Sequence, residues 1–406
     1  MNRITTKVDQ ILFLLALVAT ILGLFVIYDA GFARSIQFDQ GIIPREFKAQ
    51  LVSTVLALGV GALITMVPLK FWQRNRTWVF VLTLLALLAT HAPGIGVTQS
   101  GATRWIGIGP LQLQPSEFAK VGVILFLAGA FAVRKDWVQP RVPSGRWDVW
   151  LDRIAVPKLI RALPLLAVLV IVLKIELEPD LGTAAVVMMI AFVMMWVGGV
   201  TKKSMLIVAC TGLIFAGLLA VKQPYRFERI TGHMHRWESK NIDDVGYQTT
   251  QSEIHQASTG WKILGVGSGR AKHMLPGATT DFVLATVGEE LGLFGVLGVM
   301  AIILLIVLRL LYLCQFATSK MGALILAGVA GWLSVQSCVN VMMANGALPP
   351  IGIPLPFFSS GGSSLIALWL AMGIAQAAVA ADAEKEGVRE HSDHGWRDRR
   401  SRLSRA

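Results

Sequence analysis

Charged side chains are scarce in this sequence. Asp, Glu, Lys and Arg account for 15% of the 406 residues, whereas hydrophobic residues account for 54%, with a mean hydropathy of +0.61. Soluble globular domains carry about 25% charged residues, so this balance excludes an ordinary soluble protein. Cysteine is scarce too: Cys210, Cys314 and Cys338 lie inside apolar runs and show no CxxC spacing. We therefore expect neither a disulfide nor a cysteine-bound metal.

Uncharged apolar runs recur along nearly the whole chain. A helix that crosses a bilayer needs roughly 20 mostly apolar residues. The sequence therefore predicts an all-α polytopic membrane protein with about ten transmembrane helices, over residues 11–28, 51–69, 78–97, 116–133, 159–175, 181–200, 204–221, 282–308, 321–343 and 361–381. The first run follows Arg3 and Lys7 as a signal peptide would. It lacks a clear small-residue cleavage site, so we interpret it as a retained helix.

Basic residues mostly fall on one side of these spans. The net charge of +12 could indicate nucleic acid, but Lys and Arg gather in particular loops and in the C-terminal tail. Orientation in a membrane explains this clustering better, because cytoplasmic loops are enriched in basic residues. The pattern predicts cytoplasmic N- and C-termini and no nucleic-acid partner. The basic inner loops would then be 70–76, 134–153, 202–203 and the loop at Lys320.

Two polar segments stand apart from the spans. Residues 222–280 form a large loop between the seventh and eighth predicted helices, and loops of that length escape the charge rule, so we expect it outside. Residues 382–406 are a charged, basic tail without apolar periodicity, predicted to be disordered and cytoplasmic. Residues 1–381 then form a single transmembrane domain.

Ionisable residues, glycines and prolines gather at the predicted outer ends of the helices, in segments 101–120, 178–183, 225–281 and 345–364. In the first segment Ser116 could cap a helix whose first turn holds Glu117 and then Lys120, with Arg104 upstream. An interfacial ion pair is one interpretation. The other is a cavity lined by these groups, since ionisable residues in spanning helices usually face a bundle interior or water.

Carboxylates mark the second segment. Lys174, Glu176, Glu178 and Asp180 gather around Pro179, between two spans that leave almost no loop. They could form a hydrated turn, or the carboxylates could bind a divalent cation, which prefers oxygen ligands. The spacing leaves both interpretations open.

Thr280 and Asp281 precede an apolar helix at the end of the third segment. Either residue could be the N-cap of that helix. A carboxylate beside apolar residues can also have a raised pKa, which suits a general base. Two turns further in, Glu289 and Glu290 require cationic partners, for which Lys120 or Arg104 are the candidates.

The fourth segment mixes prolines, glycines and hydroxyl residues. A re-entrant turn is one interpretation, because irregular backbone is tolerated at membrane depth where protein or water satisfies it. The Gly-Gly-Ser-Ser run that contains Ser363 also begins a helix, whose free N–H groups could bind a phosphate.

Taken together, these motifs resemble the SEDS (shape, elongation, division and sporulation) family, to which RodA and FtsW belong. The resemblance covers nearly all of residues 11–381. It rests on GATRW at 101–105, QPSEFAK at 114–120, EPDLGT at 178–183, YQ at 247–248, TDF at 280–282, GEELG at 288–292 and GGSS at 361–364. This chain departs from the family pattern at Gly277 and Thr279, where Glu and His are common, and at Ser360, where Tyr is common.

The resemblance implies a peptidoglycan glycosyltransferase of the bacterial cytoplasmic membrane that polymerises lipid II into a nascent glycan strand, with inversion at the donor carbon. It implies a class B penicillin-binding protein, a transpeptidase, as partner, and a possible divalent cation, Mg²⁺ or Mn²⁺, with unknown ligands. Asp281 corresponds to the family's catalytic aspartate and would be the general base. The substrate-binding candidates are Arg104, Glu117, Lys120, Thr280, Gln248 and Ser363. Among them, we expect Arg104 and Lys120 to stabilise the pyrophosphate leaving group.

Two other functions fit the spans and intramembrane charges. One is a flippase or transporter of lipid-linked precursors, although it would need polar groups across the whole membrane thickness. The other is a non-catalytic scaffold for a penicillin-binding protein, which the departures beside Asp281 allow.

Overall fold

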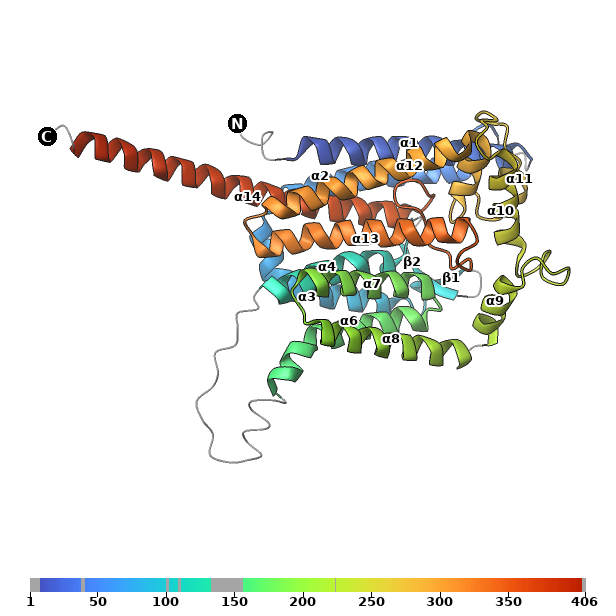
Figure 1. The fold of residues 1–406 in the computed structure, drawn as a ribbon, viewed down its shortest axis with the longest axis horizontal. Helices are drawn as coiled ribbons and strands as arrows, with labels where there is room; N and C mark the ends of the chain where they lie inside the picture. The colour runs from blue at the N-terminus through green and yellow to red at the C-terminus, as the bar shows by residue number, and fades with distance from the viewer. Residues whose placement is uncertain are drawn as a thin grey trace, which may run out of the picture.

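Long helices dominate the fold (Figure 1). The computed structural model describes residues 8–37, 41–99, 102–108, 111–132, 156–222 and 224–403. Each predicted span overlaps a long helix: α1 (Gln10–Gln37), α2 (Arg45–Thr65), α3 (Leu69–Ala89), α4 (Pro115–Ala132), α6 (Val156–Leu177), α7 (Leu181–Val197), α8 (Lys202–Lys222), α12 (Val283–Phe316), α13 (Lys320–Ala344) and α14 (Gly362–Leu403).

Within the described residues, six helices are long and apolar enough to cross a membrane: α1, α2, α4, α12, α13 and residues Gly362–Ala383 of α14. The predicted class of an all-α polytopic membrane protein is confirmed. α7 is apolar but has only 17 residues. The first two turns of α3 contain the basic residues Lys70, Arg74 and Arg76.

A small antiparallel sheet interrupts the helices. It consists of β1 (Gly96–Gln99), β2 (Ala102–Ile108) and β3 (Leu111–Leu113), with Val97 opposite Trp105 and Gly107 opposite Gln112. The third predicted span therefore extends too far, since α3 ends at Ala89 and β1 starts at Gly96. Pro93 and Gly94 explain the early end, because neither residue supports a continuing helix.

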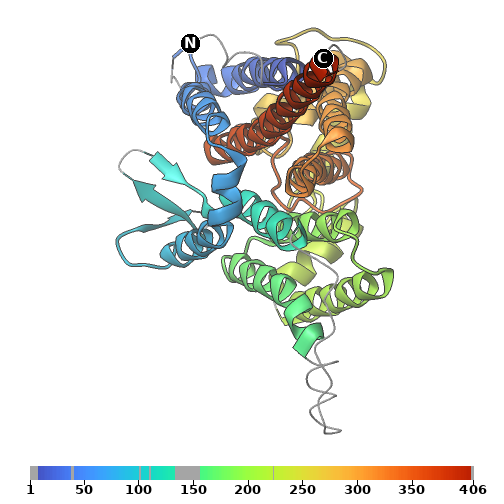
Figure 2. The ribbon, with the colours of Figure 1, turned by 90° about the vertical axis from the view of Figure 1, so that its left-hand side faces the viewer.

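The sheet and the short helices lie together at one end of the bundle. In Figure 1 the strands, α9 (Pro224–Met234), α10 (Tyr247–Thr259) and α11 (Ala271–Met274) occupy the end opposite to both chain termini. Most of α4 is buried in the protein, since 78% of its 18 residues are buried. Figure 2 shows α4 near the middle of the bundle and the sheet at its side.

The predicted outer loop folds into α9, α10 and α11 with connecting turns, and it packs against the broken start of α12. Gly292 interrupts α12 with φ 63° and ψ −163°. A Cβ there would lie 2.3 Å from the Lys262 carbonyl oxygen, so a side chain does not fit. The Leu293 N–H donates to the Gly260 carbonyl at 2.9 Å, which satisfies backbone freed by the break.

The last helix is longer than its predicted span. α14 runs from Gly362 to Leu403, whereas the predicted span ended at residue 381. Its residues include many strong helix formers, Ala, Glu, Lys and Arg, and no proline interrupts them. The predicted inner basic loop at 134–153 lies outside the described residues.

Candidate functional site

Asp281 ends a tight turn that leads into α12. Gly277, with φ 79°, allows this turn, and its carbonyl accepts from the N–H groups of Thr280 at 2.9 Å and Phe282 at 3.0 Å. The residue at the N-cap position is Phe282, which makes no side-chain cap hydrogen bond. The interpretation of Thr280 or Asp281 as the cap of α12 is therefore wrong.

Neighbouring segments hold the backbone of this turn. Asn340 of α13 donates its amide to the carbonyls of Asp281 at 2.8 Å and Ile353 at 2.7 Å. The Ser359 hydroxyl donates to the Thr280 carbonyl at 2.5 Å. On the side of the turn, these bonds involve main-chain carbonyls only. Among the described residues, none donates a hydrogen bond to the Asp281 carboxylate, which stays available to a ligand.

Charged groups from two other segments act on Asp281. Burial, opposed by the Arg229 guanidinium and reinforced by the Asp180 carboxylate, raises the pKa of the Asp281 carboxyl to about 6. Arg229 comes from α9 and Asp180 from the turn before α7. A carboxyl with a pKa near neutrality can accept a proton more readily than an ordinary aspartate.

Asp180 joins three of the sequence motifs. Its carboxylate caps α7 by accepting from the Thr183 N–H at 3.2 Å, and it also accepts from the Gln114 amide at 3.1 Å and the Ser116 hydroxyl at 3.3 Å. Ser116 lies inside α4, so it does not cap that helix as predicted. The Gln114 N–H donates to the Ser363 hydroxyl at 3.0 Å, which brings the start of α14 to the same place.

Arg104 contacts the turn that carries Asp180. Its Nε donates to the Glu178 carbonyl at 2.7 Å, and its Nη2 donates to the Pro179 carbonyl. The Glu178 side chain points into a separate network with Thr90 at 2.8 Å and Lys174 at 3.1 Å. Burial raises the pKa of the Glu178 carboxyl, against these hydrogen bonds.

Lys120 is buried inside the bundle, with 1% of its surface exposed. Its ammonium lies 2.8 Å from Glu117 and 2.9 Å from Gln336, and it stands over the Trp332 ring at 5.2 Å. Arg104 does not share these contacts. Gln336 in turn donates to the Pro354 carbonyl at 2.8 Å, so the Lys120 cluster supports the loop between α13 and α14.

Glu289 and Glu290 have partners other than the predicted Lys120 and Arg104. Glu289 lies 2.9 Å from His255 of α10, and Glu290 lies 2.7 Å from Lys272 of α11. The prediction of their partners was wrong because the folded outer loop, whose position the sequence does not reveal, supplies both partners.

Two further predictions concern Gln248 and a metal. Gln248 is half-buried in the first turn of α10, and its side chain makes no hydrogen bond to other described residues. No group of three or more His, Cys, Asp or Glu residues in the described part of the chain could hold a metal ion. Asp180 nevertheless lies within electrostatic reach of Asp281, and Mg²⁺ often uses one or two carboxylates together with substrate phosphates.

Sequence patterns did not reveal the contributions of Arg229 and Asn340. Arg229 is one basic residue among several in the outer loop, and Asn340 is a lone polar residue in an apolar helix. Asn340 could have been noticed as a buried amide in an apolar helix, since buried polar groups require partners. No comparable signal pointed to Arg229.

Comparison with known proteins gives a consistent result. The family model described as "Cell cycle protein", covering FtsW, RodA and SpoVE, matches residues 9–384. A probable peptidoglycan glycosyltransferase FtsW from Saccharophagus degradans is 34% identical over 77% of this chain and 78% of its own. The corresponding protein from Nitrosomonas europaea is 32% identical over 91% of this chain and 92% of its own.

Two solved structures are similar over almost the whole chain. One is a chain of a peptidoglycan synthase complex that coordinates polymerization and crosslinking, with a TM-score of 0.71 and 27% identity over 92% of this chain and 98% of that chain. The other is the rod shape determining protein RodA of Thermus thermophilus, with a TM-score of 0.63 and 26% identity over 93% and 98%.

Proposed function

The chain belongs to the FtsW, RodA and SpoVE family of cell cycle proteins and is a peptidoglycan glycosyltransferase, and we propose that it polymerises lipid II with Asp281 as general base. It is a multi-pass protein of the bacterial inner membrane. The finer proposal is that the end of the bundle carrying Asp281 faces outward and that both termini are cytoplasmic.

The environment of Asp281 carries this proposal. Its carboxyl has a pKa of about 6 and no protein donor among the described residues, so it can accept a proton from a bound hydroxyl. The acceptor sugar oxygen would bond to the anomeric carbon of the donor as the bond to pyrophosphate breaks. The proton passes to Asp281, the lipid pyrophosphate leaves, and the donor carbon is inverted without a covalent enzyme intermediate.

Cationic groups would stabilise the leaving pyrophosphate. Arg229 acts on Asp281 electrostatically and is the cation we assign to that role. Arg104 would hold the Glu178–Asp180 turn in place and lie beside the substrate, whereas Glu117 and Lys120 would support the site from inside the bundle. Thr280, Gln248 and Ser363 remain candidates for sugar or phosphate contacts.

A divalent cation, Mg²⁺ or Mn²⁺, is also proposed. When bound it would neutralise charge on the pyrophosphate. Asp180 would supply a carboxylate, and the substrate phosphates would supply other oxygens.

A class B penicillin-binding protein is the proposed partner. This rests on the likeness to a polymerase chain in a complex that also crosslinks. A transpeptidase beside the polymerase would act on each new strand as it emerges, and nascent glycan and membrane lipids would complete its surroundings.

The alternatives predict different outcomes in one experiment. Purified protein is incubated with lipid II, with and without its partner, and glycan strands are separated on a gel. We expect glycan strands to form only in reactions that contain this protein. A flippase would move lipid II between the leaflets of proteoliposomes without forming strands, and a scaffold would yield strands only from another enzyme. The sequence segments rich in ionisable residues lie at the predicted outer ends of the helices, which argues against a flippase.

A further inference from the structure

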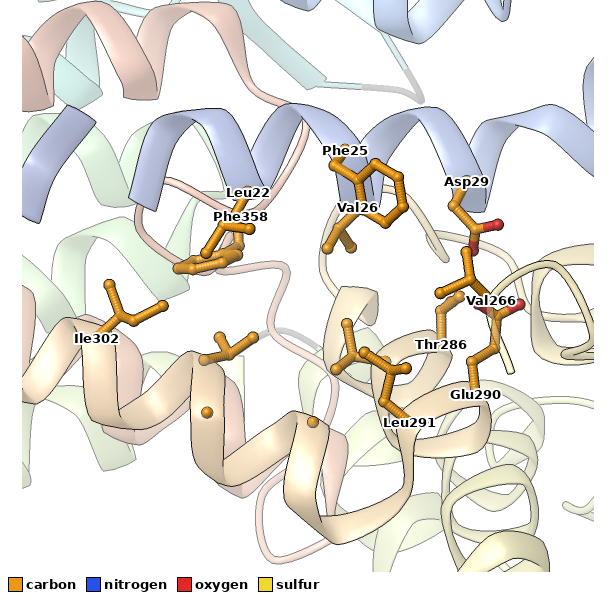
Figure 3. A pocket seen from close by; sticks show the side chains of 14 residues that line it. Leu22, Phe25, Val26, Asp29, Val266, Thr286, Glu290, Leu291, Ile302 and Phe358 are labelled. Atoms are coloured by element: carbon orange, nitrogen blue, oxygen red, sulfur yellow. The ribbon is translucent and has the colours of Figure 1, made fainter. Parts of the chain in front are cut away.

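A cavity of about 320 Å³ lies between α1 and α12 (Figure 3). Apolar side chains from both helices form most of its lining, among them Leu22, Phe25, Leu291 and Ile302. Leu22 is 40% exposed and Phe25 is 54% exposed on a helix that can span the membrane. The cavity therefore borders on lipid, and a hydrocarbon chain can enter it.

One end of the cavity is polar. Asp29 of α1 and Glu290 of α12 both line this end, as Figure 3 shows. The Lys272 ammonium bridges them at 3.1 Å and 2.7 Å, and its side chain is 2% exposed. The two carboxyl groups also hydrogen-bond to each other and share this one ammonium, so the acidic groups outnumber the cation and favour a cationic ligand group over an anionic one.

Thr286 supplies a second observation that points to a ligand. It lines the cavity beside Glu290 in Figure 3 and is 1% exposed. Its hydroxyl has no hydrogen-bond partner among the described residues. Buried hydroxyls are normally paired, so an oxygen of a bound molecule would complete this group.

We propose that this cavity binds a membrane phospholipid with a cationic amine headgroup, such as phosphatidylethanolamine. One acyl chain lies along the apolar wall, an ester oxygen accepts from Thr286, and the amine faces Asp29 and Glu290. A lipid-linked sugar fits this site less well, because its pyrophosphate would meet the two carboxylates. The site is distinct from the Asp281 site and does not depend on the proposed function.

The cavity also touches the segment that holds the Asp281 turn. Phe358 lines the cavity. Its neighbour Phe357 has φ 68°, and this backbone conformation is energetically unfavourable for any residue other than glycine. The two residues after Phe358 hydrogen-bond to the turn. The Ser359 hydroxyl donates to the Thr280 carbonyl at 2.5 Å, and the Ser360 N–H donates to the Thr279 carbonyl at 2.8 Å. A lipid packed against Phe358 would support this conformation and thereby the position of Asp281.

The test uses the full-length protein in nanodiscs that contain phosphatidylethanolamine with a photoreactive diazirine in its acyl chain. Gly298→Leu should fill the cavity, because Gly298 lines it and an added Cβ there meets no atom within 4 Å. Gly59→Leu is the control, since Gly59 of α2 has the same open space outside the cavity.

We expect ultraviolet light to label peptides of α1 and α12 in the wild type and in Gly59→Leu. Losing the burial of two methylenes lowers binding by about tenfold or more, so labelling should fall by that factor in Gly298→Leu. Equal labelling of the two glycine variants, at matched thermal stability, would overturn the proposal.

The headgroup is tested in the same nanodiscs by competition. Unlabelled phosphatidylethanolamine should reduce the labelling more than phosphatidylglycerol does, and Asp29→Asn should weaken that preference. Equal competition by the two lipids would overturn the amine assignment. Stronger competition by a polyprenyl pyrophosphate would show that the occupant is the substrate lipid. Because the readout is labelling, a failed polymerase assay would leave this result unaffected.

Discussion

At the residue scale, Asp281 depends on groups that the chain brings from distant segments. Its backbone is held by Asn340 and its pKa is affected by Arg229 and Asp180. Because the folded-state pKa is raised to about 6, the carboxyl is largely protonated below that pH and ionised above it. A general base works only in the ionised form, so polymerisation should lose activity as the pH falls through this value.

The pH profile of kcat/KM tests this assignment. We expect activity to fall about tenfold per unit below pH 6, as a single required deprotonation dictates. Arg229→Gln should move the inflection to higher pH, because the guanidinium lowers the pKa of Asp281. Asp180→Asn should move it to lower pH, because it removes a negative neighbour. An inflection that stays fixed in both variants would show that another group titrates.

Asn340 is a positioning residue. Its substitution should displace the Asp281 carboxylate without changing the groups that take part in the reaction. Asn340→Ala removes both bonds to the Asp281 and Ile353 carbonyls, so the turn should shift. A displacement of about 1 Å can cost about 10²-fold in rate, so we expect kcat to fall with little change in KM. Asn345→Ala is the control, because Asn345 is exposed and its side chain accepts one hydrogen bond within the described residues, from the nearby Ala347 N–H. Equal kcat in the two variants would refute the positioning role.

At the element scale, the break in α12 sets the direction of the segment that follows Asp281. Gly292 adopts φ 63°, and a Cβ added there would lie 2.3 Å from the Lys262 carbonyl oxygen. Gly292→Ala should lower the free energy of unfolding by about 1–3 kcal/mol, through strain and the clash. Gly298→Ala in the same helix should have little effect, since its surroundings are open. Thermal unfolding in detergent measures both, and equal stability of the two variants would contradict this account of the break.

Much of the fold was predictable because long apolar runs report directly on helices that cross a membrane. The motifs likewise predicted a site at one end of the bundle, since they follow the ends of those helices. The sequence could not predict which residues meet. His255, Lys272 and Arg229 come from a polar loop without periodicity, and their positions depend on how that loop folds onto α12. The sheet was missed because its three strands are short, with four, seven and three residues.

At the scale of the whole molecule, the charge distribution implies an orientation that remains a prediction. Asp243, exposed between α9 and α10, should lie outside the cell, and Lys320, exposed at the start of α13, should lie inside. In a background without Cys210, Cys314 and Cys338, Asp243→Cys should react with an impermeant maleimide in intact cells. Lys320→Cys should react only after the cells are opened. The reverse labelling would invert the membrane orientation and with it the outward site.

The most direct test of the central claim compares Asp281→Asn and Asp281→Ala with the wild type in a lipid II polymerisation gel, at matched expression and membrane insertion. Asn keeps the shape of the side chain but cannot accept a proton as a carboxylate does. General base catalysis contributes about 10²–10⁴-fold, so both variants should lose activity by roughly that factor while remaining folded. Near-normal polymerisation by Asp281→Asn would contradict the account, and the base would have to be sought at another carboxylate such as Asp180.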